Sequence, residues 1–175
     1  MSLPRISIVV PVYNSAPFIA ATLESVIAQS FCDWEMVVVD DGSPDAAAVI
    51  VEEFCRRDPR IRLVQQANQG VANARNSGLA KTDPRTEFVI FLDSDDMWQP
   101  AALATLLATL EAQPQAAGAH SIARTVDERG EPFQPGMAEK ILRQRRAVQP
   151  AAHGAGGMLT VNTSRAGFDT WRALA

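Results

Sequence analysis

The amino-acid sequence predicts an α/β fold in which helices flank a mostly parallel central sheet. Short runs of β-branched and aromatic residues alternate with helical stretches from residue 5 to about residue 123, which is the pattern of βαβ units. The run 88–92 is continuously apolar, as is typical of a strand covered on both faces. The chain has 175 residues, of which 47% are hydrophobic, and this is enough to bury a core. We expect one main domain over residues 4–132.

The first half of this domain contains two predicted strand–helix units. Residues 6–10 form the first strand, which Pro11 and the three residues after it are expected to end. A helix begins at Ser15, with Pro17 just inside it, and runs to about residue 29. Residues 34–39 form the second strand, and Asp45 is placed to cap a helix that runs to about residue 57.

The second half continues the alternation and then loses it. A third strand over 61–64, a turn at 68–70 and a short helix over 71–80 precede the apolar strand 88–92. The next helix begins near Pro100 and runs to about residue 113, and residues 118–126 are predicted as a fifth strand. Beyond about residue 132 the alternation fails. We interpret residues 133–175 as a truncated or divergent segment that is partly flexible.

Charge and cysteine content argue against several classes of function. The net charge of −4, with both signs interspersed, gives no basic surface for nucleic acid. Cys32 and Cys55 are too few for a disulfide framework and are expected to be buried free thiols, which fits a reducing cytoplasm. The first residues do not form a signal peptide pattern, and no apolar run reaches membrane-spanning length. We therefore expect a cytoplasmic chain, or the soluble part of a longer one.

A basic run over residues 140–146 bears on location and partners. Its cations are Lys140, Arg143, Arg145 and Arg146. Such a run is either a solvated helix face or a contact with anionic lipid headgroups or a phosphate-bearing acceptor. The second interpretation predicts peripheral association with a membrane.

Three carboxylates follow the apolar strand 88–92, namely Asp93, Asp95 and Asp96. Open α/β sheets bind ligands at the carboxyl ends of their strands, and adjacent acids repel one another there unless a cation compensates. Mg²⁺ or Mn²⁺ binds one or two carboxylates together with phosphate oxygens, so the cluster predicts a divalent metal and a nucleoside diphosphate. The structural alternative is a solvated acidic turn that caps the next helix.

Two further segments are expected at the same edge, because parallel strands end there together. Asp41, after the second strand, is an acceptor either for a nucleobase imide or ribose hydroxyl or for helix capping. Tyr13, after the first strand, offers its ring either to a base or to the core. Arg75 is interpreted as a ligand of a diphosphate, as a partner of the acids after residue 92, or as a plain surface residue.

The residues after the first strand argue against other folds that bind nucleotides or phosphates. A dinucleotide-binding domain needs a Gly-rich turn there, and this chain has Pro11-Val12-Tyr13-Asn14 instead. A phosphatase with an aspartyl nucleophile and a phospho-receiver domain both need acids at this position. A nucleotidyltransferase needs a Gly-rich loop with Arg or Lys. This segment contains none of these patterns.

Four ordered motifs resemble the inverting family-two glycosyltransferases. They are Ile8-Val9-Val10-Pro11-Val12-Tyr13-Asn14, Val38-Val39-Asp40-Asp41-Gly42-Ser43, Asn68-Gln69-Gly70 with Ala74-Arg75-Asn76-Ser77-Gly78-Leu79-Ala80, and Phe91-Leu92-Asp93-Ser94-Asp95-Asp96. The resemblance covers residues 5–123. It implies the GT-A fold, a Rossmann-related sandwich, with residues 4–132 binding a nucleotide-diphospho-sugar, foremost a UDP-sugar, and Mn²⁺ or Mg²⁺. It further implies the following site: Pro11, Tyr13 and Asp41 line the base pocket, Asp93 approaches the ribose, and Asp95 with Asp96 binds the metal.

The acceptor half departs from the family pattern. Such enzymes place a Glu-Asp pair after a Gly-Gly-Phe-Asp-like turn, where its carboxylate deprotonates the acceptor hydroxyl. Gly167-Phe168-Asp169 is similar to that turn, but no Glu-Asp pair follows it. The catalytic base is therefore unassigned, and its weak candidates are Asp127, Glu128, Glu131, Glu139 and Asp169.

Two hypotheses about function follow from the sequence. The first is a glycosyltransferase that transfers a sugar from a nucleotide-diphospho-sugar, with inversion, to an acceptor that is a sugar, a lipid or a protein. The second is a nucleotide-sugar-binding module without transferase activity of its own, which the missing Glu-Asp pair favours.

Overall fold

Strands and helices alternate along the chain as the sequence predicts. The structure is a computed structural model that describes residues 3–121 and 172–173. The strands are β1 (Ile6–Val12), β2 (Trp34–Asp40), β3 (Ile61–Gln65), β4 (Phe88–Phe91) and the two-residue β5 (Arg172–Ala173). The helices are α1 (Ile19–Ile27), α2 (Ala47–Arg57), α3 (Val71–Leu79) and α4 (Ala102–Ala112).

The strands form one sheet in the order β3-β2-β1-β4-β5. β1 lies at its centre and pairs in parallel with β2 and with β4, and β3 extends the parallel part beyond β2. β5 is antiparallel to β4. The mostly parallel α/β fold predicted from the sequence is therefore confirmed. Because β1 to β4 run in the same direction, their carboxyl ends share one edge of the sheet.

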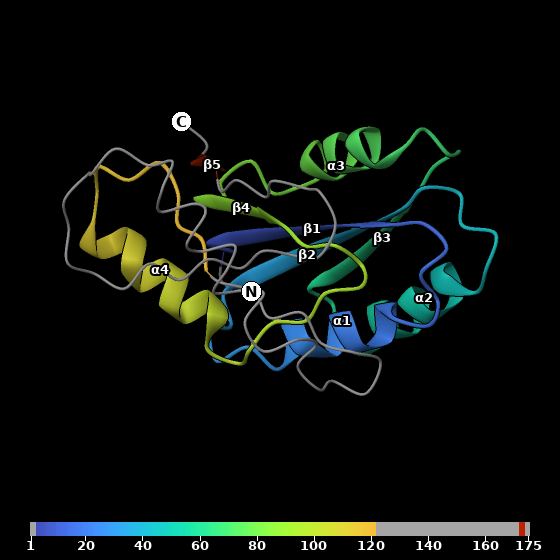
Figure 1. Ribbon diagram of the computed structural model, residues 1–175, viewed down its shortest axis with the longest axis horizontal. Helices are drawn as coiled ribbons and strands as arrows, with labels where there is room; N and C mark the ends of the chain where they lie inside the picture. The colour runs from blue at the N-terminus through green and yellow to red at the C-terminus, as the bar shows by residue number, and fades with distance from the viewer. Residues whose placement is uncertain (1–2, 122–171, 174–175) are drawn as a thin grey trace, which may run out of the picture.

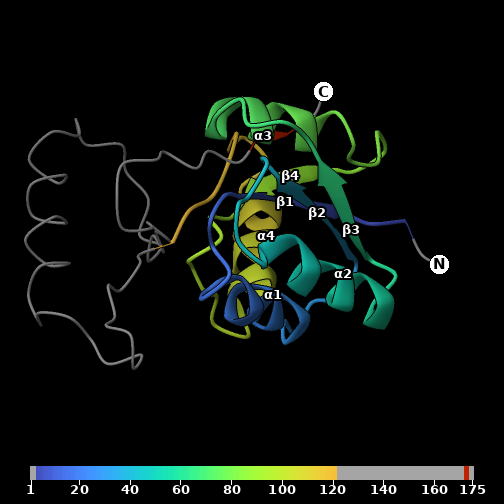
Figure 2. The ribbon, with the colours of Figure 1, turned by 90° about the vertical axis from the view of Figure 1, so that its right-hand side faces the viewer.

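The helices form two layers around this sheet. α3 lies on one face, and α1, α2 and α4 lie on the other (Figures 1 and 2). Successive side chains of a strand point to opposite faces, so the even-numbered residues of β1, such as Ile8 and Val10, pack into the large core beside α1, α2 and α4. Val37, Val39 and Ala74 form a smaller apolar cluster under α3. No helix within the described ranges is both long enough and apolar enough to cross a membrane.

Gly78 brings α3 close to the sheet. A Cβ atom at this position would lie 2.3 Å from Cγ1 of Val9 and 3.0 Å from Cγ2 of Val39, so a side chain has no room. Interiors are packed at the density of organic crystals, and a contact of this kind is relieved only by moving the helix or the strands. The height of α3 above β1 and β2 therefore depends on a glycine at this position.

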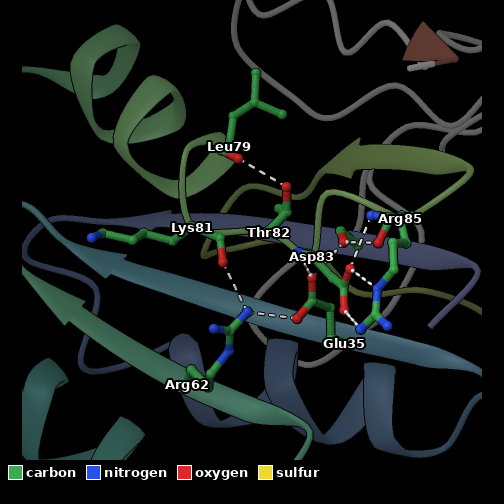
Figure 3. Close-up of polar contacts among 9 residues, drawn as sticks. Glu35, Arg62, Leu79, Lys81, Thr82, Asp83 and Arg85 are labelled. Carbon is green, nitrogen blue, oxygen red and sulfur yellow. Dashed lines mark hydrogen bonds and ion pairs between the residues drawn. The ribbon is translucent and has the colours of Figure 1, made fainter. Parts of the chain in front are cut away.

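A polar network holds the opposite, amino edge of the sheet (Figure 3). Glu35 on β2 accepts hydrogen bonds from Ser7 Oγ at 2.7 Å, from Arg62 Nη2 at 2.6 Å and from the backbone N–H of Asp83. Ser7 Oγ also shares a hydrogen bond of 2.8 Å with the buried hydroxyl of Thr86. This network fixes the connection between α3 and β4 to three neighbouring strands.

Several sequence predictions of detail are wrong. β1 continues through Pro11 to Val12. The carbonyl of Val9 accepts the N–H of Leu92, so Val9 faces β4. Pro11 is two residues further on and faces the same side, but β4 has already ended there. No residue of β4 therefore needs the N–H that a proline lacks. The first helix begins at Ile19, after a turn closed by two N–H groups that donate to Ser15 O. Cys32 is exposed.

The predicted fifth strand is also not supported where it is described. Residues 118–121 contain no strand, and residues 122–126 lie outside the described part of the chain. The predicted domain boundary at 132–133 and the basic run 140–146 lie outside it as well. The fifth strand of the sheet is formed instead by Arg172–Ala173.

Candidate functional site

A pocket of about 610 Å³ lies at the carboxyl edge of the sheet. Its lining comes from the end of β1 and the turn after it, from the end of β2, from the start of α3, and from the loop after β4. The lining residues are Pro11, Val12, Tyr13, Asn14, Ser15, Phe18, Asp41, Asn68, Gly70, Val71, Ala74, Arg75, Asp93, Ser94 and Asp95. The predicted convergence of distant segments at this edge is therefore present in the structure.

Most of the predicted site residues line this pocket. They are Pro11, Tyr13, Asp41, Arg75, Asp93 and Asp95. Asp96, the second predicted metal ligand, is half-buried and is not among the lining residues. The candidate bases Asp127 and Asp169 lie outside the described residues, as do Glu128, Glu131 and Glu139.

Asp41 is the most constrained of these carboxylates. It is only 3% exposed, and its Oδ1 accepts hydrogen bonds from Gln66 Nε2 at 2.8 Å and from the N–H of Gln69 at 2.9 Å. Its Oδ2 accepts the N–H of Gly70 at 2.8 Å. Burial opposes ionisation of Asp41, but these hydrogen bonds outweigh it and hold the pKa of the carboxyl below its ordinary value. The carboxylate thus fixes the loop before α3, and Oδ2 keeps a further lone pair for a ligand.

Gly70 completes this arrangement. Its φ of 86° lies in the left-handed region, which glycine adopts without strain. This conformation turns its N–H toward Asp41 and starts α3 at the next residue. The interpretation of Asp41 as a cap of the next helix in the sequence is therefore wrong. Asp41 instead binds the backbone of the loop that leads into α3.

Apolar side chains form the mouth of the pocket. Tyr13 is 53% exposed, Phe18 is 49% exposed and Val71 is 55% exposed, and all three line the pocket. Tyr13 is therefore not a core residue, and its ring is open to a planar ligand. Phe18 and Val71 were not identified from the sequence, because single apolar residues at helix starts also occur as ordinary surface residues.

The charged side chains of the pocket come from α3 and from the loop after β4. Arg75 Nη2 donates to Asp93 Oδ1 at 2.7 Å, which confirms the pairing that was one of the three interpretations of this arginine. Asp95 is exposed at the pocket. With Asp41 included, three carboxylates and one guanidinium line the pocket. A bound diphosphate would add negative charge to this surplus, which a cation would offset.

The loop after β4, residues 93–96, which we call the acidic loop, supplies few ligands for a metal by itself. Within the described part of the chain, no group of three His, Cys, Asp or Glu side chains could hold a metal ion. Mg²⁺ and Mn²⁺ do not require such a group, because they bind through one or two carboxylates and complete their shell with phosphate oxygens and water. The exposed carboxylate of Asp95 offers hard oxygen donors of the kind that such an ion binds, whereas Asp96 does not line the pocket.

Buried hydroxyls lie behind the acidic loop and were missed in the sequence analysis. Ser94 and Ser15 share a hydrogen bond of 2.7 Å between their Oγ atoms, and Ser15 Oγ donates to Tyr13 O at 3.1 Å. Thr22 Oγ1 donates to Ser94 O at 2.9 Å. A usable signal was present in the sequence, because Thr22 stands among Ile19, Leu23 and Val26 on the apolar face of its helix.

The fold and the pocket define an α/β protein whose pocket lies at the carboxyl edge of a parallel sheet, where open α/β sheets bind their ligands. Comparison with known proteins gives the family. Residues 7–163 match Glycosyl transferase family 2, and the chain belongs to this family. The fold is accordingly the GT-A fold expected from the four motifs.

Similar solved structures include two complexes with nucleotide sugars. S. aureus TarS 1–349 in complex with UDP-GlcNAc superposes with a TM-score of 0.65 and 32% sequence identity, over 74% of this chain and 37% of that one. Mannosyltransferase PcManGT from Pyrobaculum calidifontis, in complex with GDP-Man and Mn²⁺, superposes with a TM-score of 0.63 and 29% identity, over 71% of this chain and 37% of that one.

Relatives among curated proteins include two that are named glycosyltransferases. The uncharacterized glycosyltransferase EpsJ of Bacillus subtilis is 42% identical over 94 residues, which are 54% of this chain and 27% of EpsJ. Glycosyltransferase GlyA of Streptococcus pneumoniae is 40% identical over 102 residues, which are 58% of this chain and 14% of GlyA. The chain thus spans about a quarter or less of the length of these two relatives.

Proposed function

We propose that this chain binds a nucleotide-diphospho-sugar, foremost a UDP-sugar, and that the protein transfers the sugar to an acceptor with inversion at the anomeric carbon. One observation carries the proposal. A single pocket combines an open aromatic ring and a buried carboxylate with an arginine and the acidic loop, all at the carboxyl edge of the sheet. These two sets of groups match the two ends of such a donor, a planar base and a charged diphosphate.

Each end of the donor has its own residues in this proposal. Tyr13 stacks on the base, Pro11 lies beside it, and Asp41 accepts a hydrogen bond through the free lone pair of Oδ2. Asp93 approaches the ribose. Arg75 and the N-terminal amides of the nine-residue helix α3 face the diphosphate. The bound UDP-GlcNAc and GDP-Man of the similar structures support a donor of this class.

Asp95, together with Asp96, would hold Mn²⁺ or Mg²⁺. When bound, the ion supplies positive charge that offsets the diphosphate and the acidic loop and stabilises the nucleoside diphosphate as it leaves. The Mn²⁺ in the PcManGT complex supports this assignment.

Inversion requires a base that deprotonates the acceptor hydroxyl as it attacks the anomeric carbon. The base is unassigned, and Asp127 and Asp169 are its weak candidates within residues 1–175. The acceptor is a sugar, a lipid or a protein. A cytoplasmic location, with peripheral membrane contact through residues 140–146, belongs to the same proposal and is supported by the four cations of that run.

A binding module without transferase activity is the second candidate. The observation that favours it is that residues 1–175 contain no Glu-Asp pair of the kind that such enzymes use as the base. The two candidates differ in turnover and agree in donor binding.

The test is calorimetry of the 175-residue chain with UDP-GlcNAc and with GDP-mannose, each in Mn²⁺ and in EDTA. We expect binding of at least one donor in Mn²⁺ and a loss of binding in EDTA. Absence of binding to either donor and to free UDP would refute the proposal. A second assay detects donor hydrolysis or transfer through the nucleoside diphosphate that is released. Turnover identifies the transferase, and donor binding without turnover identifies the binding module.

A further inference from the structure

Three polar side chains lie along one face of α1 and the turn that follows it. They are Thr22, Ser25 and Gln29, which we call the α1 polar stripe. Their spacing of three and four residues places them on the same side of the helix. Thr22 is fully buried and Gln29 is only 4% exposed, although the neighbouring buried positions of the helix are apolar. Buried polar groups at such positions require hydrogen-bond partners.

The partners of the stripe are backbone groups of the segment between β4 and α4 and of the first turn of α4. Thr22 Oγ1 donates to Ser94 O at 2.9 Å, and Ser25 Oγ accepts the N–H of Trp98 at 3.1 Å. Gln29 Nε2 donates to the backbone O of residue 99 at 2.8 Å, while its Oε1 accepts the N–H of residue 103 at 3.0 Å. Residues 92–101 form no strand or helix. Their backbone groups therefore lack the hydrogen bonds of a regular element, and the side chains of the stripe supply some of these bonds instead.

The stripe meets the pocket at Ser94. This residue stands between Asp93 and Asp95, which both line the pocket. Its carbonyl is held by Thr22, and its hydroxyl is held by Ser15 at 2.7 Å. Ser94 is therefore fixed at two points, which restrains the backbone from which the two flanking carboxylates extend.

We propose that the α1 polar stripe, and Thr22 above all, positions the acidic loop for the diphosphate and metal end of the donor. The inference rests on the proposed function, because it concerns how that donor is held. Thr22 acts through the backbone of Ser94 and is a positioning residue. Loss of its hydroxyl leaves Ser94 O without its donor and releases the loop at the point between the two carboxylates.

Thr22→Val tests the proposal, because valine has nearly the same shape and lacks the hydroxyl. Thr22→Ser keeps the hydroxyl and is expected to restore binding. Thr86→Val is the matched control: Thr86 is also a buried threonine with a hydrogen-bonded hydroxyl, and it lies at the opposite edge of the sheet. Both valine variants remove one buried hydrogen bond, but only one of them touches the acidic loop.

The 175-residue chain and its variants are titrated with UDP in Mn²⁺ and, by ligand-observed NMR, with uridine, and their stability is measured by urea unfolding. We expect Thr22→Val to weaken UDP binding by about three- to tenfold, which corresponds to one hydrogen bond. Uridine affinity should fall by less than UDP affinity in the same variant, since only its ribose reaches the acidic loop, at Asp93, and the base contacts are elsewhere. Thr22→Ser and Thr86→Val should bind UDP as the unchanged chain does.

The outcomes separate the inference from the function on which it rests. If the unchanged chain binds neither UDP nor UDP-GlcNAc in Mn²⁺, the proposed function is wrong and the inference falls with it. If the unchanged chain binds UDP and Thr22→Val binds it equally well, or loses UDP and uridine to the same extent, the positioning role is wrong. Should Thr22→Val fail to fold, Ser25→Ala is the replacement test, because Ser25 is only half-buried and its loss should disturb the fold less. An unchanged UDP affinity in that variant would likewise overturn the proposal.

Discussion

Arg75 on α3 donates from Nη2 to Oδ1 of Asp93 at 2.7 Å and so joins two sides of the pocket. The side chains are 21% and 22% exposed, which places the pair between a surface ion pair and a buried one. A guanidinium has several N–H donors, so the carboxylate orients it without using all of them. The pairing thus holds the positively charged guanidinium of Arg75 beside the acidic loop, where a diphosphate is expected.

Arg75→Met should weaken binding of UDP by about ten- to a hundredfold, because hydrogen bonds to charged groups contribute about 1.5–3 kcal/mol each. Uridine affinity should fall by less, since only its ribose lies near this pair, at Asp93, and calorimetry with UDP together with NMR titration of uridine measures both. Arg85→Met is the control, since Arg85 is exposed and pairs with Asp83 at the opposite edge of the sheet. Equal losses for UDP and uridine would show that Arg75 supports the pocket as a whole.

Asp95→Asn should remove most of the metal dependence of UDP binding. Three carboxylates line the pocket, and a diphosphate is repelled there unless a bridging cation is bound. The ratio of UDP affinities in Mn²⁺ and in EDTA measures the effect, and it should fall toward one in the variant. Glu53→Gln, which changes an exposed acid on α2, should leave the ratio unaltered. A ratio near one in the unchanged chain would refute the metal assignment.

Much of the sheet could be predicted from the sequence because its signals are local. The uninterrupted apolar run that ends at Asp93 predicts a buried parallel strand, and the Gly and Asn turns predict where the chain reverses. Pro11 misled the prediction, because a proline is excluded from a strand only where a neighbour needs its N–H. That need depends on where β4 ends, which is a tertiary fact.

The candidate site could be predicted as a set of residues but not as a set of contacts. Asp41 was expected to act as an acceptor either for the nucleotide or for helix capping. The structure shows it buried, with three hydrogen bonds to residues 66–70. Those partners are more than twenty residues away in the sequence. A local sequence pattern cannot predict contacts between residues so far apart. The partners of Thr22 were hidden for the same reason.

Gly78→Ala should destabilise the fold by about 1–3 kcal/mol, the usual effect of overpacking a close contact. The added methyl group would meet Val9 and Val39, and α3 would have to move away from the sheet. Urea unfolding measures the loss of stability. The loss caused by Gly78→Ala should be smaller in a chain that also carries Val9→Ala, because the smaller side chain leaves room for the added methyl group. A Cβ at Gly70 would meet open space, so Gly70→Ala tests backbone strain alone. Equal effects with and without Val9→Ala would contradict the packing explanation.

Asp41→Asn should destabilise the chain by about 1–3 kcal/mol at neutral pH, because an amide group turned toward the N–H groups of residues 69 and 70 cannot accept from both oxygen positions. The pKa of Asp41 is lowered by folding, so the contribution of its ionised form is complete above the unfolded value, near pH 4. It is lost as the pH falls through the lower folded value. The stability gap between the two chains should therefore be constant from pH 7 to about pH 5 and shrink below about pH 4.

Urea unfolding of the unchanged chain and of Asp41→Asn, measured at intervals from pH 7 to pH 3, tests this dependence. Gln66→Ala removes one of the three donors to Asp41, so the gap between Gln66→Ala and its double variant with Asp41→Asn should be smaller at neutral pH. UDP affinity should fall in Asp41→Asn as well, because the loop that starts α3 is no longer held. A stability gap that stays the same down to pH 3 would mean that Asp41 contributes through its shape, and the charge of the carboxylate would then have no part in fixing the loop.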